Sequence, residues 1–264
     1  MEHIFGREWE ITPAGGVTGK AYFARNGGQQ LFLKKNSSPF LAVLSAEGIV
    51  PKLIWTKRLE NGDVISAQHW LDGRELKPHE MAKPRVAKLM CKIHSSQPLL
   101  SMLEKLGKKP SSPEMIMSAL ANRLDEEVSG CSEVQSALRF LKSRIGEVTH
   151  GDYVVCHGDV NHNNWLLSAD NQLYLIDWDG AMIGDPAIDL GMLLYKYVEK
   201  DEWQAWLSQY GLTYTPHLEL RMKWYVLAQI LLAIQWDKEE KRLSEMRAGL
   251  ADIRAILEGS SPAC

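Results

Sequence analysis

Short runs of alternating apolar and polar positions fill the N-terminal part of the chain, and turn residues separate them. Such alternation is typical of strands with one buried face. Asn26-Gly27-Gly28 and Glu60-Asn61-Gly62-Asp63 are strong hairpin turns. The apolar segment 39–47 is instead predicted as a helix that ends at Gly48. The predicted strands are residues 21–25, 31–35, 53–56 and 64–68.

Apolar positions at helical spacing dominate the rest of the chain. The residues that recur on one face after Pro84 are Val86, Leu89, Met90 and Ile93. Further helices are predicted at 114–128, at 132–145 and across 187–257, with breaks near Gly211 and Pro216. The segment 70–73 interrupts the pattern. We therefore expect an α+β protein with a small β-rich N-terminal lobe, residues 1–70, and a larger, mainly helical C-terminal lobe, residues 71–264.

Composition narrows the class of protein. The 264 residues are 45% hydrophobic and 24% charged, with a net charge of -3, so no global basic surface for nucleic acid is indicated. The four cysteines are far apart and form no C-x-x-C pair, which favours a reducing compartment. The N-terminal residues include no apolar run, so no signal peptide is expected, and no window is apolar enough for a membrane span. A cytoplasmic protein is expected.

The strongest chemical signal is the run from His157 to Asn164, which contains Asp159 and is followed by a second carboxylate, Asp177. Phosphoryl transfer from ATP needs a carboxylate that accepts the proton of the attacking hydroxyl. It also needs an amide and another carboxylate that hold Mg²⁺. The spacing matches H-x-D-x-x-x-x-N followed by D-x-x of the kinase motifs. A D-x-x-x-x-N string alone arises by chance in turns, but the added His157-Gly158 and Asp177 favour a kinase site.

The sequence between Asn164 and Asp177 is predicted as a hairpin, with strands at 165–167 and 173–176 and a turn at 168–172. A hairpin there returns Asn164 and Asp177 to the same end of the sheet, close enough to share one Mg²⁺. Asp179 is a candidate ligand of a second metal ion or a contact to a substrate hydroxyl, and equally a simple turn residue.

A glycine-rich segment precedes the first predicted strand and includes Gly15, Gly16 and Gly19. Glycines let backbone N–H groups approach phosphate oxygens closely. The segment is not a Walker A loop, because Ala14 and Ala21 replace a required glycine and a required Ser or Thr. A strand follows rather than a helix, which favours a glycine-rich flap over ATP, with an ordinary glycine turn as the alternative.

Lys34 ends the apolar strand Leu31-Phe32-Leu33, as the phosphate-binding lysine ends V-A-I-K in kinases. Lys35 is the alternative, because one step along a strand reverses the face. The usual helical glutamate partner is in doubt. Glu47 is the only carboxylate in the predicted helix 39–47, and it is the last residue there.

Polar residues near Asp159 are candidate substrate contacts, namely Asn161 and His162, together with the aromatic Trp224 further along the chain. Four tryptophans fall in the C-terminal helices, at positions 203, 206, 224 and 236, where aromatic residues more often pack in the core. Asp185 precedes Pro186 as a helix cap, and Asp189 is a candidate anchor behind the catalytic loop.

Taken together, these segments resemble the aminoglycoside phosphotransferase and choline/thiamine kinase superfamily. Within it, the chain is most similar to the CcrZ-type cell-cycle regulators of Gram-positive bacteria. The finer resemblance rests on Lys-Asn-Ser-Ser-Pro at 35–39, Pro-Lys-Leu-Ile-Trp at 51–55 and Ala-Gln-His-Trp-Leu at 67–71, beside the His157 loop and Ile176-Asp177-Trp178-Asp179.

The resemblance implies a bilobal protein-kinase-like fold with ATP between the lobes and adenine bonded to a hinge formed by His69, Trp70 and Leu71. It implies that Asp159, with His157 in the same loop, catalyses transfer to a small hydroxyl compound, with ribose, 2-deoxyribose or a ribosyl compound favoured as acceptor. It also implies a role in replication initiation through DnaA and a link to FtsZ. The alternatives are a choline, thiamine or aminoglycoside kinase and a pseudokinase scaffold.

Overall fold

A computed structural model describes residues 8–14, 21–149 and 151–259 of the chain. It contains two compact units, of which the first combines Met1–Glu75 with Asn164–Asp179 and the second combines Leu76–Asn163 with Gly180–Cys264. The first unit therefore includes a hairpin from the middle of the sequence, which the expected division at residue 70 did not anticipate. The assignment of ATP binding to residues 1–70 and of catalysis to residues 71–264 stays a prediction.

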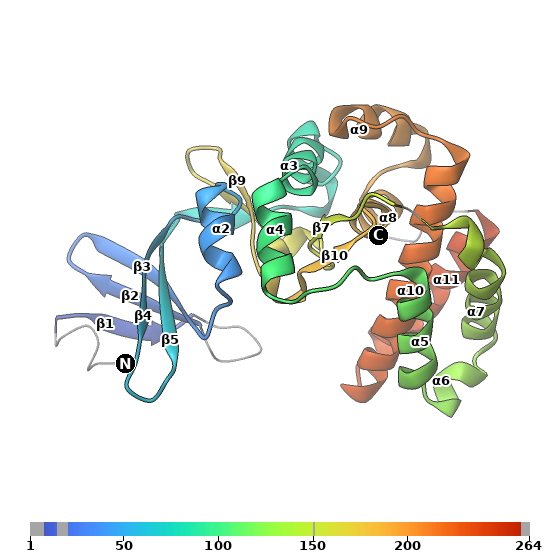
Figure 1. The fold of residues 1–264 in the computed structure, drawn as a ribbon, viewed down its shortest axis with the longest axis horizontal. Helices are drawn as coiled ribbons and strands as arrows, with labels where there is room; N and C mark the ends of the chain where they lie inside the picture. The colour runs from blue at the N-terminus through green and yellow to red at the C-terminus, as the bar shows by residue number, and fades with distance from the viewer. Residues whose placement is uncertain (1–7, 15–20, 150, 260–264) are drawn as a thin grey trace. The chain divides into compact units, whose positions relative to one another are not determined.

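A five-stranded antiparallel sheet forms most of the first unit, with strand order β1-β2-β3-β5-β4 (Figure 1). Both predicted hairpins are confirmed, and Gly27 adopts the positive φ of 54° that its tight turn needs. Strand β1 was not predicted. The bounds are β1 Glu10–Pro13, β2 Ala21–Asn26, β3 Gln29–Lys35, β4 Leu53–Arg58 and β5 Val64–His69.

The two faces of this sheet differ. One carries a buried apolar cluster of Ala24, Leu31, Leu33, Ile65 and Ala67. Because consecutive strand residues point to opposite faces, Lys34 lies on the other face. Helix α2, Phe40–Ala46, ends at Glu47 and Gly48 as predicted.

A second sheet in the first unit has the order β6-β8-β9, with β6 Gly73–Glu75, β8 Trp165–Ser168 and β9 Leu173–Leu175. Strands β8 and β9 form the hairpin predicted between Asn164 and Asp177. In β6, a Cβ on Gly73 would lie 2.7 Å from the carbonyl oxygen of Leu167, so only glycine lets the two backbones approach this closely.

Helices form most of the second unit, together with a small sheet in which β7 Val154–Cys156 pairs with β10 Met182–Gly184. No helix in the described ranges is long and apolar enough to cross a membrane. The α-helices are α3 Pro84–His94, α4 Gln97–Lys105, α5 Pro113–Arg123, α6 Glu126–Gly130, α7 Ser132–Arg144, α8 Ala187–Tyr197, α9 Trp203–Tyr210, α10 Pro216–Glu239 and α11 Leu243–Glu258. The 3₁₀ helices are η1 Pro78–Glu80, η2 Ile145–Glu147, η3 His162–Asn164, η4 Trp178–Gly180 and η5 Lys200–Glu202.

The helix predicted over 114–128 is in fact two helices, α5 and α6. Leu124 adopts an extended backbone after α5, and the carboxylate of Asp125 accepts a hydrogen bond from the Val128 N–H at 2.9 Å. An aspartate cap of this kind starts a new helix, which the apolar spacing alone does not reveal. The predicted breaks at Gly211 and Pro216 are confirmed, since Gly211 ends α9 with a φ of 105° and Pro216 begins α10.

Helix α10 organises the second unit, because it packs against α5, α7, α8 and α11 (Figure 1). Its Arg221 is buried and binds the buried carboxylate of Asp185 through Nε at 2.8 Å and Nη2 at 2.5 Å. Asp185 also accepts a hydrogen bond from the Ala187 N–H at 2.8 Å, at the start of α8. Asp185 therefore caps the start of α8, as predicted, and also forms a buried ion pair that links this helix start to α10.

We expect Arg221→Ala to lower the free energy of unfolding by about 3–5 kcal/mol, because the substitution leaves the Asp185 carboxylate buried and without its charged partner. Urea unfolding followed by circular dichroism measures the change. Arg247→Ala, on the exposed side of α11, is the matched control and should change stability by less than about 0.5 kcal/mol. Equal stability of the two variants would contradict the expected contribution of the Arg221–Asp185 ion pair to the free energy of unfolding.

Candidate active site

Lys34 binds two carboxylates of the hairpin segment in the first unit. Its Nζ lies 3.0 Å and 3.1 Å from the two carboxylate oxygens of Asp179 and 3.4 Å from Oδ1 of Asp177. Both carboxylates are largely exposed, at 58% for Asp177 and 68% for Asp179, so they are open to a ligand. The partner of Lys34, which the sequence left undecided, is this carboxylate pair rather than Glu47.

Lys35 takes a different partner. Its Nζ lies 2.7 Å from Asp63, which also accepts a hydrogen bond from Asn36 at 2.9 Å. The hydrogen bond from Lys35, followed by that from Asn36, lowers the pKa of Asp63 to about 2. Lys35 thus belongs to the β4–β5 turn, whereas Lys34 lies with the candidate metal ligands. This geometry supports the choice of Lys34 as the phosphate-binding lysine.

The backbone holds Asn164 and Asp177 at one end of the β8–β9 hairpin, as predicted. The Ile176 N–H donates to the Asn164 carbonyl at 2.8 Å. Asp177 has a φ of 64°, a left-handed conformation that costs energy in residues other than glycine and recurs at functional sites. Trp178 steadies the segment, because its Nε1 donates to the Leu175 carbonyl at 2.7 Å and its ring packs edge-on against Phe40.

The chemistry of this group of side chains fits Mg²⁺. Asp177 and Asp179 supply carboxylate oxygens, and Asn164 supplies an amide oxygen. Oxygen donors of this kind are the ligands that Mg²⁺ prefers. Asn164 is nearly buried, at 9% exposed, whereas the two aspartates face solvent. The three predicted metal ligands are therefore chemically suited to a divalent cation beside Lys34.

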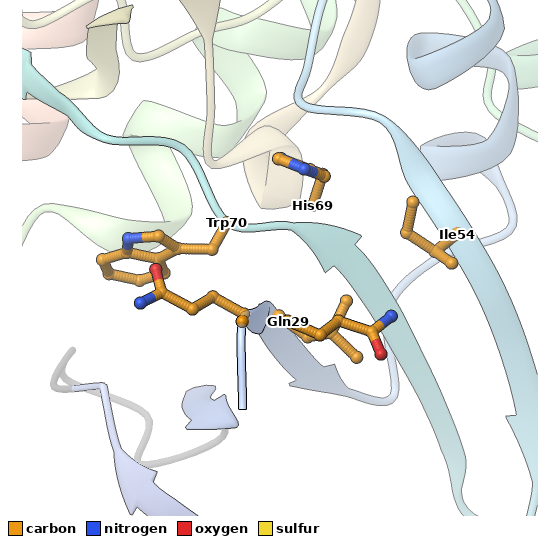
Figure 2. Close-up of a pocket in the computed structure, with 7 residues that line it drawn as sticks. Gln29, Ile54, His69 and Trp70 are labelled. Carbon is orange, nitrogen blue, oxygen red and sulfur yellow. The ribbon is translucent and has the colours of Figure 1, made fainter. Parts of the chain in front are cut away.

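The predicted adenine-binding hinge borders a pocket of about 380 Å³, shown in Figure 2. Its lining is Gly28, Gln29, Gln30, Leu31, Ile54, His69 and Trp70. Leu31 and His69, two of these residues, are cross-strand partners in β3 and β5.

Two of the three predicted hinge N–H groups already have acceptors. His69 donates to the Lys52 carbonyl at 2.8 Å, and Trp70 donates to the Gln30 carbonyl at 3.3 Å. Adenine binding by His69, Trp70 and Leu71 stays a prediction. Gly15, Gly16 and Gly19 lie outside the described residues, and their contact with phosphate stays a prediction.

The catalytic loop of the second unit positions Asp159 by contacts within the loop. The buried His157 ring accepts a hydrogen bond from the Asp159 N–H through Nδ1 at 3.2 Å, and Asn161 donates to the Asp159 carboxylate. Gly158 has a φ of 81°, and a Cβ there would lie 3.3 Å from the Gly180 carbonyl oxygen. Since the His157 side chain is 0% exposed, the prediction of a catalytic His157 is corrected to a positioning residue, while Asp159 is exposed.

Asp189 anchors this loop from behind, as the sequence predicted. Its carboxylate accepts the backbone N–H of His157 at 2.7 Å and of Gly158 at 2.9 Å, and it lies 3.1 Å from Nε2 of His94. The other ring nitrogen of His94 lies 2.8 Å from the Tyr210 hydroxyl. Burial raises the pKa of Asp189, but the hydrogen bond and charge of His94, the charge of His157 and the Gly158 N–H outweigh it and leave the pKa lowered.

Sequence reasoning missed His94 and Tyr210. The sequence offered one weak indication of His94. This residue continues the buried face of α3 formed by Met90 and Ile93, and a buried polar side chain needs a hydrogen-bond partner.

The predicted substrate residues have different environments. Asn161 Oδ1 accepts a hydrogen bond from Lys196 Nζ at 2.7 Å. The Tyr197 hydroxyl lies 3.1 Å from the His162 backbone nitrogen and 3.2 Å from its Nδ1. Asn161 and His162 are thus part of a polar group around Asp159, to which α8 adds two residues that the sequence did not point to.

Trp224 does not belong to this polar group. It is 0% exposed and its Nε1 donates to the Leu141 carbonyl at 3.0 Å. A side chain that is wholly buried and hydrogen-bonded has no surface for a substrate, so the prediction of Trp224 as a substrate contact is corrected. Trp203 and Trp206 are buried as well, which confirms the core-packing interpretation for these three, whereas Trp236 is 42% exposed.

Comparison with known proteins identifies the family. The phosphotransferase enzyme family matches residues 10–225. The fold is similar to choline kinase LicA from Streptococcus pneumoniae, at 20% identity over 95% of each chain with a TM-score of 0.68. It is similar to a choline/ethanolamine kinase family protein from Mesorhizobium loti, at 15% identity over 98% of this chain and 91% of that chain with a TM-score of 0.69.

An aminoglycoside phosphotransferase is equally similar in fold. The neighbour is a thermostable mutant of APH(4)-Ia, solved in a ternary complex with ADP and hygromycin B. The two sequences are 15% identical over 99% of the present chain and 98% of the neighbour, with a TM-score of 0.69. The chain belongs to the phosphotransferase enzyme family, since the match covers most of its length. Family membership identifies it as a phosphotransferase. The predicted kinase-like α+β fold and the superfamily are confirmed.

We expect Lys34→Ala to raise the dissociation constant for ATP at least about tenfold, because a charged hydrogen-bond donor to the phosphates is lost. Lys35→Ala is the matched control from the same strand and should change ATP affinity less than about twofold, since Lys35 binds Asp63 instead. Isothermal titration calorimetry measures both. A larger loss in Lys35→Ala than in Lys34→Ala would reverse the assignment of the two lysines.

Proposed function

We propose that this phosphotransferase phosphorylates a hydroxyl of D-ribose, 2-deoxyribose or a ribosyl compound, as the motif resemblance implies. The observation that carries the proposal is the polar group beside Asp159. Asn161 contacts the Asp159 carboxylate, and His162 lies against the hydroxyl of Tyr197. Amide, imidazole and hydroxyl groups are suited to a sugar, which presents several hydroxyls that each need a hydrogen-bond partner.

The burial of the tryptophans argues against a choline kinase. A quaternary ammonium site needs exposed aromatic faces around the cation. Three of the four C-terminal tryptophans are no more than 3% exposed, namely Trp203, Trp206 and Trp224. For an aminoglycoside, the exposed acidic residues at 199, 201 and 202 are only a modest cluster. A pseudokinase scaffold has no chemical need for Asp159, Asn164 and Asp177 together, and the chain retains all three.

In the proposed reaction, Asp159 accepts the proton of the acceptor hydroxyl and orients its oxygen toward the γ-phosphorus of ATP. A bond forms between that oxygen and phosphorus, and the bond between phosphorus and the β–γ bridging oxygen breaks, which releases ADP. The hydrogen bond from Asn161 fixes the direction of the Asp159 carboxylate. The anchoring of the loop amides by Asp189 keeps Asp159 in place before the substrate arrives.

In the same proposal, Lys34 binds the phosphates of ATP, and Asn164, Asp177 and Asp179 hold Mg²⁺. When bound, Mg²⁺ neutralises charge on the phosphate oxygens. Lys34 must then leave at least part of its contact with the two aspartates to reach the phosphates. A lysine is suited to this exchange, because its flexible stem carries a compact charge that can move between carboxylates and phosphate.

A regulatory role belongs to the same proposal. The resemblance to the CcrZ-type cell-cycle regulators implies that the enzyme acts in the initiation of DNA replication, through DnaA and with a link to FtsZ. The support for this role is the motif resemblance at 35–39, 51–55 and 67–71.

We expect Asp159→Asn to lower kcat by about 10²–10⁴-fold, because the amide keeps the shape of the side chain and removes the base. Nucleotide affinity should stay within about twofold. Turnover beside calorimetric titration of ATP tests both statements. Asp152→Asn, an exposed aspartate before β7, is the matched control and should retain full turnover. Near-normal turnover in Asp159→Asn would remove Asp159 from the catalytic role.

We expect D-ribose or a ribosyl compound to accept phosphate from ATP and choline not to, because the polar group beside Asp159 offers hydrogen bonds rather than an aromatic cage. Parallel incubations of ribose, 2-deoxyribose, nucleosides, choline and an aminoglycoside with ATP, followed by mass detection of the phosphorylated product, test this. The Asp159→Asn variant is the control for chemistry at this site. Phosphocholine without any phosphorylated ribosyl product would overturn the proposal.

A further inference from the structure

A lysine lies beside the catalytic aspartate in the second unit. Lys196 is exposed on α8, and its Nζ is 2.7 Å from Oδ1 of Asn161. The amide nitrogen of the same Asn161 donates to the carboxylate of Asp159. One asparagine side chain therefore bridges the ammonium group of Lys196 and the carboxylate that accepts the substrate proton. The ammonium group is thus one side chain away from the Asp159 carboxylate.

Two further contacts define the surroundings of this charge. Lys196 Nζ lies 5.4 Å from the centre of the Tyr197 ring, and the Tyr197 hydroxyl contacts His162. Lys196 therefore contacts Asn161, and the next residue, Tyr197, contacts His162. On α11, burial raises the pKa of Asp252, and the charge of Lys196 opposes this rise.

The sign of this charge matters for the acceptor. Charges separated by a few ångströms at a protein surface interact strongly enough to change affinity severalfold, and like charges suppress the binding of wrong partners. An ammonium group beside Asp159 opposes a cationic acceptor and does not oppose a neutral sugar. It attracts an anionic substituent such as a phosphate.

We propose that Lys196 is a specificity-determining residue that sets the charge of the acceptor, so that the site accepts hydroxyl compounds that are neutral or anionic and excludes cationic ones. The inference rests on the proposed function, because it concerns the same acceptor site. It adds electrostatic repulsion to the reasons for excluding cationic alcohols from this site.

Charge reversal at this position is the direct test. The Lys196→Glu, Lys196→Gln and parent proteins are titrated calorimetrically with kanamycin, a hydroxyl-rich polycation, and with D-ribose, a neutral sugar, in the presence of a non-hydrolysable ATP analogue and Mg²⁺. Lys88→Glu, an exposed lysine on α3, is the matched control for a charge reversal elsewhere on the same unit.

We expect Lys196→Glu to bind kanamycin at least tenfold more tightly than the parent does, with Lys196→Gln between them. Ribose affinity should change less than threefold, because a neutral ligand is little affected by the sign of the charge. Rising salt should reduce the gain for kanamycin, as it does for interactions between exposed charges. Lys88→Glu should bind both ligands as the parent does.

Kanamycin binding to Lys196→Glu and Lys196→Gln that is no tighter than binding to the parent would overturn the inference. An equal gain in Lys88→Glu would also overturn it, because net charge would then be the cause. Failure of the proposed function is a separate result: the parent would transfer phosphate to no ribosyl compound, while the kanamycin comparison would still be decided. If Lys196→Glu does not fold, as judged by circular dichroism, the Lys196→Gln comparison decides the question.

Discussion

The buried carboxylate of Asp189 is the constraint on which the catalytic half of the second unit depends. A buried charge destabilises the folded state unless hydrogen bonds and charged partners compensate for the lost solvation. Asp189 meets this condition through the N–H groups of His157 and Gly158 and through His94. Because those N–H groups belong to the catalytic loop, satisfying the buried charge and shaping the loop are the same event. Tyr210 extends the network to α9, so that helices α3, α8 and α9 all take part in positioning Asp159.

In the first unit, by contrast, several charged groups lie close together and are exposed to solvent. Lys34 comes from β3, whereas Asp177 and Asp179 follow the β8–β9 hairpin, far along the chain. The lysine neutralises part of the repulsion between the two carboxylates. The left-handed backbone of Asp177 and the packing of Trp178 on Phe40 fix the direction of this segment. The backbone of this segment is thus held in place, while the side-chain contacts of Lys34 with Asp177 and Asp179 lie at the surface.

In the proposed function, the two groups divide the recognition of the two substrates. The charged residues of the first unit have the chemistry for triphosphate and metal, while the polar residues of the second have the chemistry for an alcohol. The second group includes the ammonium group of Lys196, which contacts Asn161. Such a division lets the acceptor site change its charge and shape without disturbing the nucleotide contacts, which is one physical reason why a single family covers varied acceptors.

The sequence by itself determined the features that depend on neighbouring residues. Alternation and glycine turns predicted the hairpins of β2 with β3 and β4 with β5, and the Asn164–Asp177 spacing predicted the β8–β9 hairpin. It also indicated Asp159, Lys34 and Asp189, because these side chains occupy fixed places relative to local motifs. It misjudged Trp224 and His157, since residue type alone does not reveal burial. Only the tertiary structure decided which distant side chains meet: Asp179 with Lys34, Arg221 with Asp185, His94 with Asp189 and Lys196 with Asn161. Such pairs form between residues far apart in the chain, where packing rather than local sequence sets the distance.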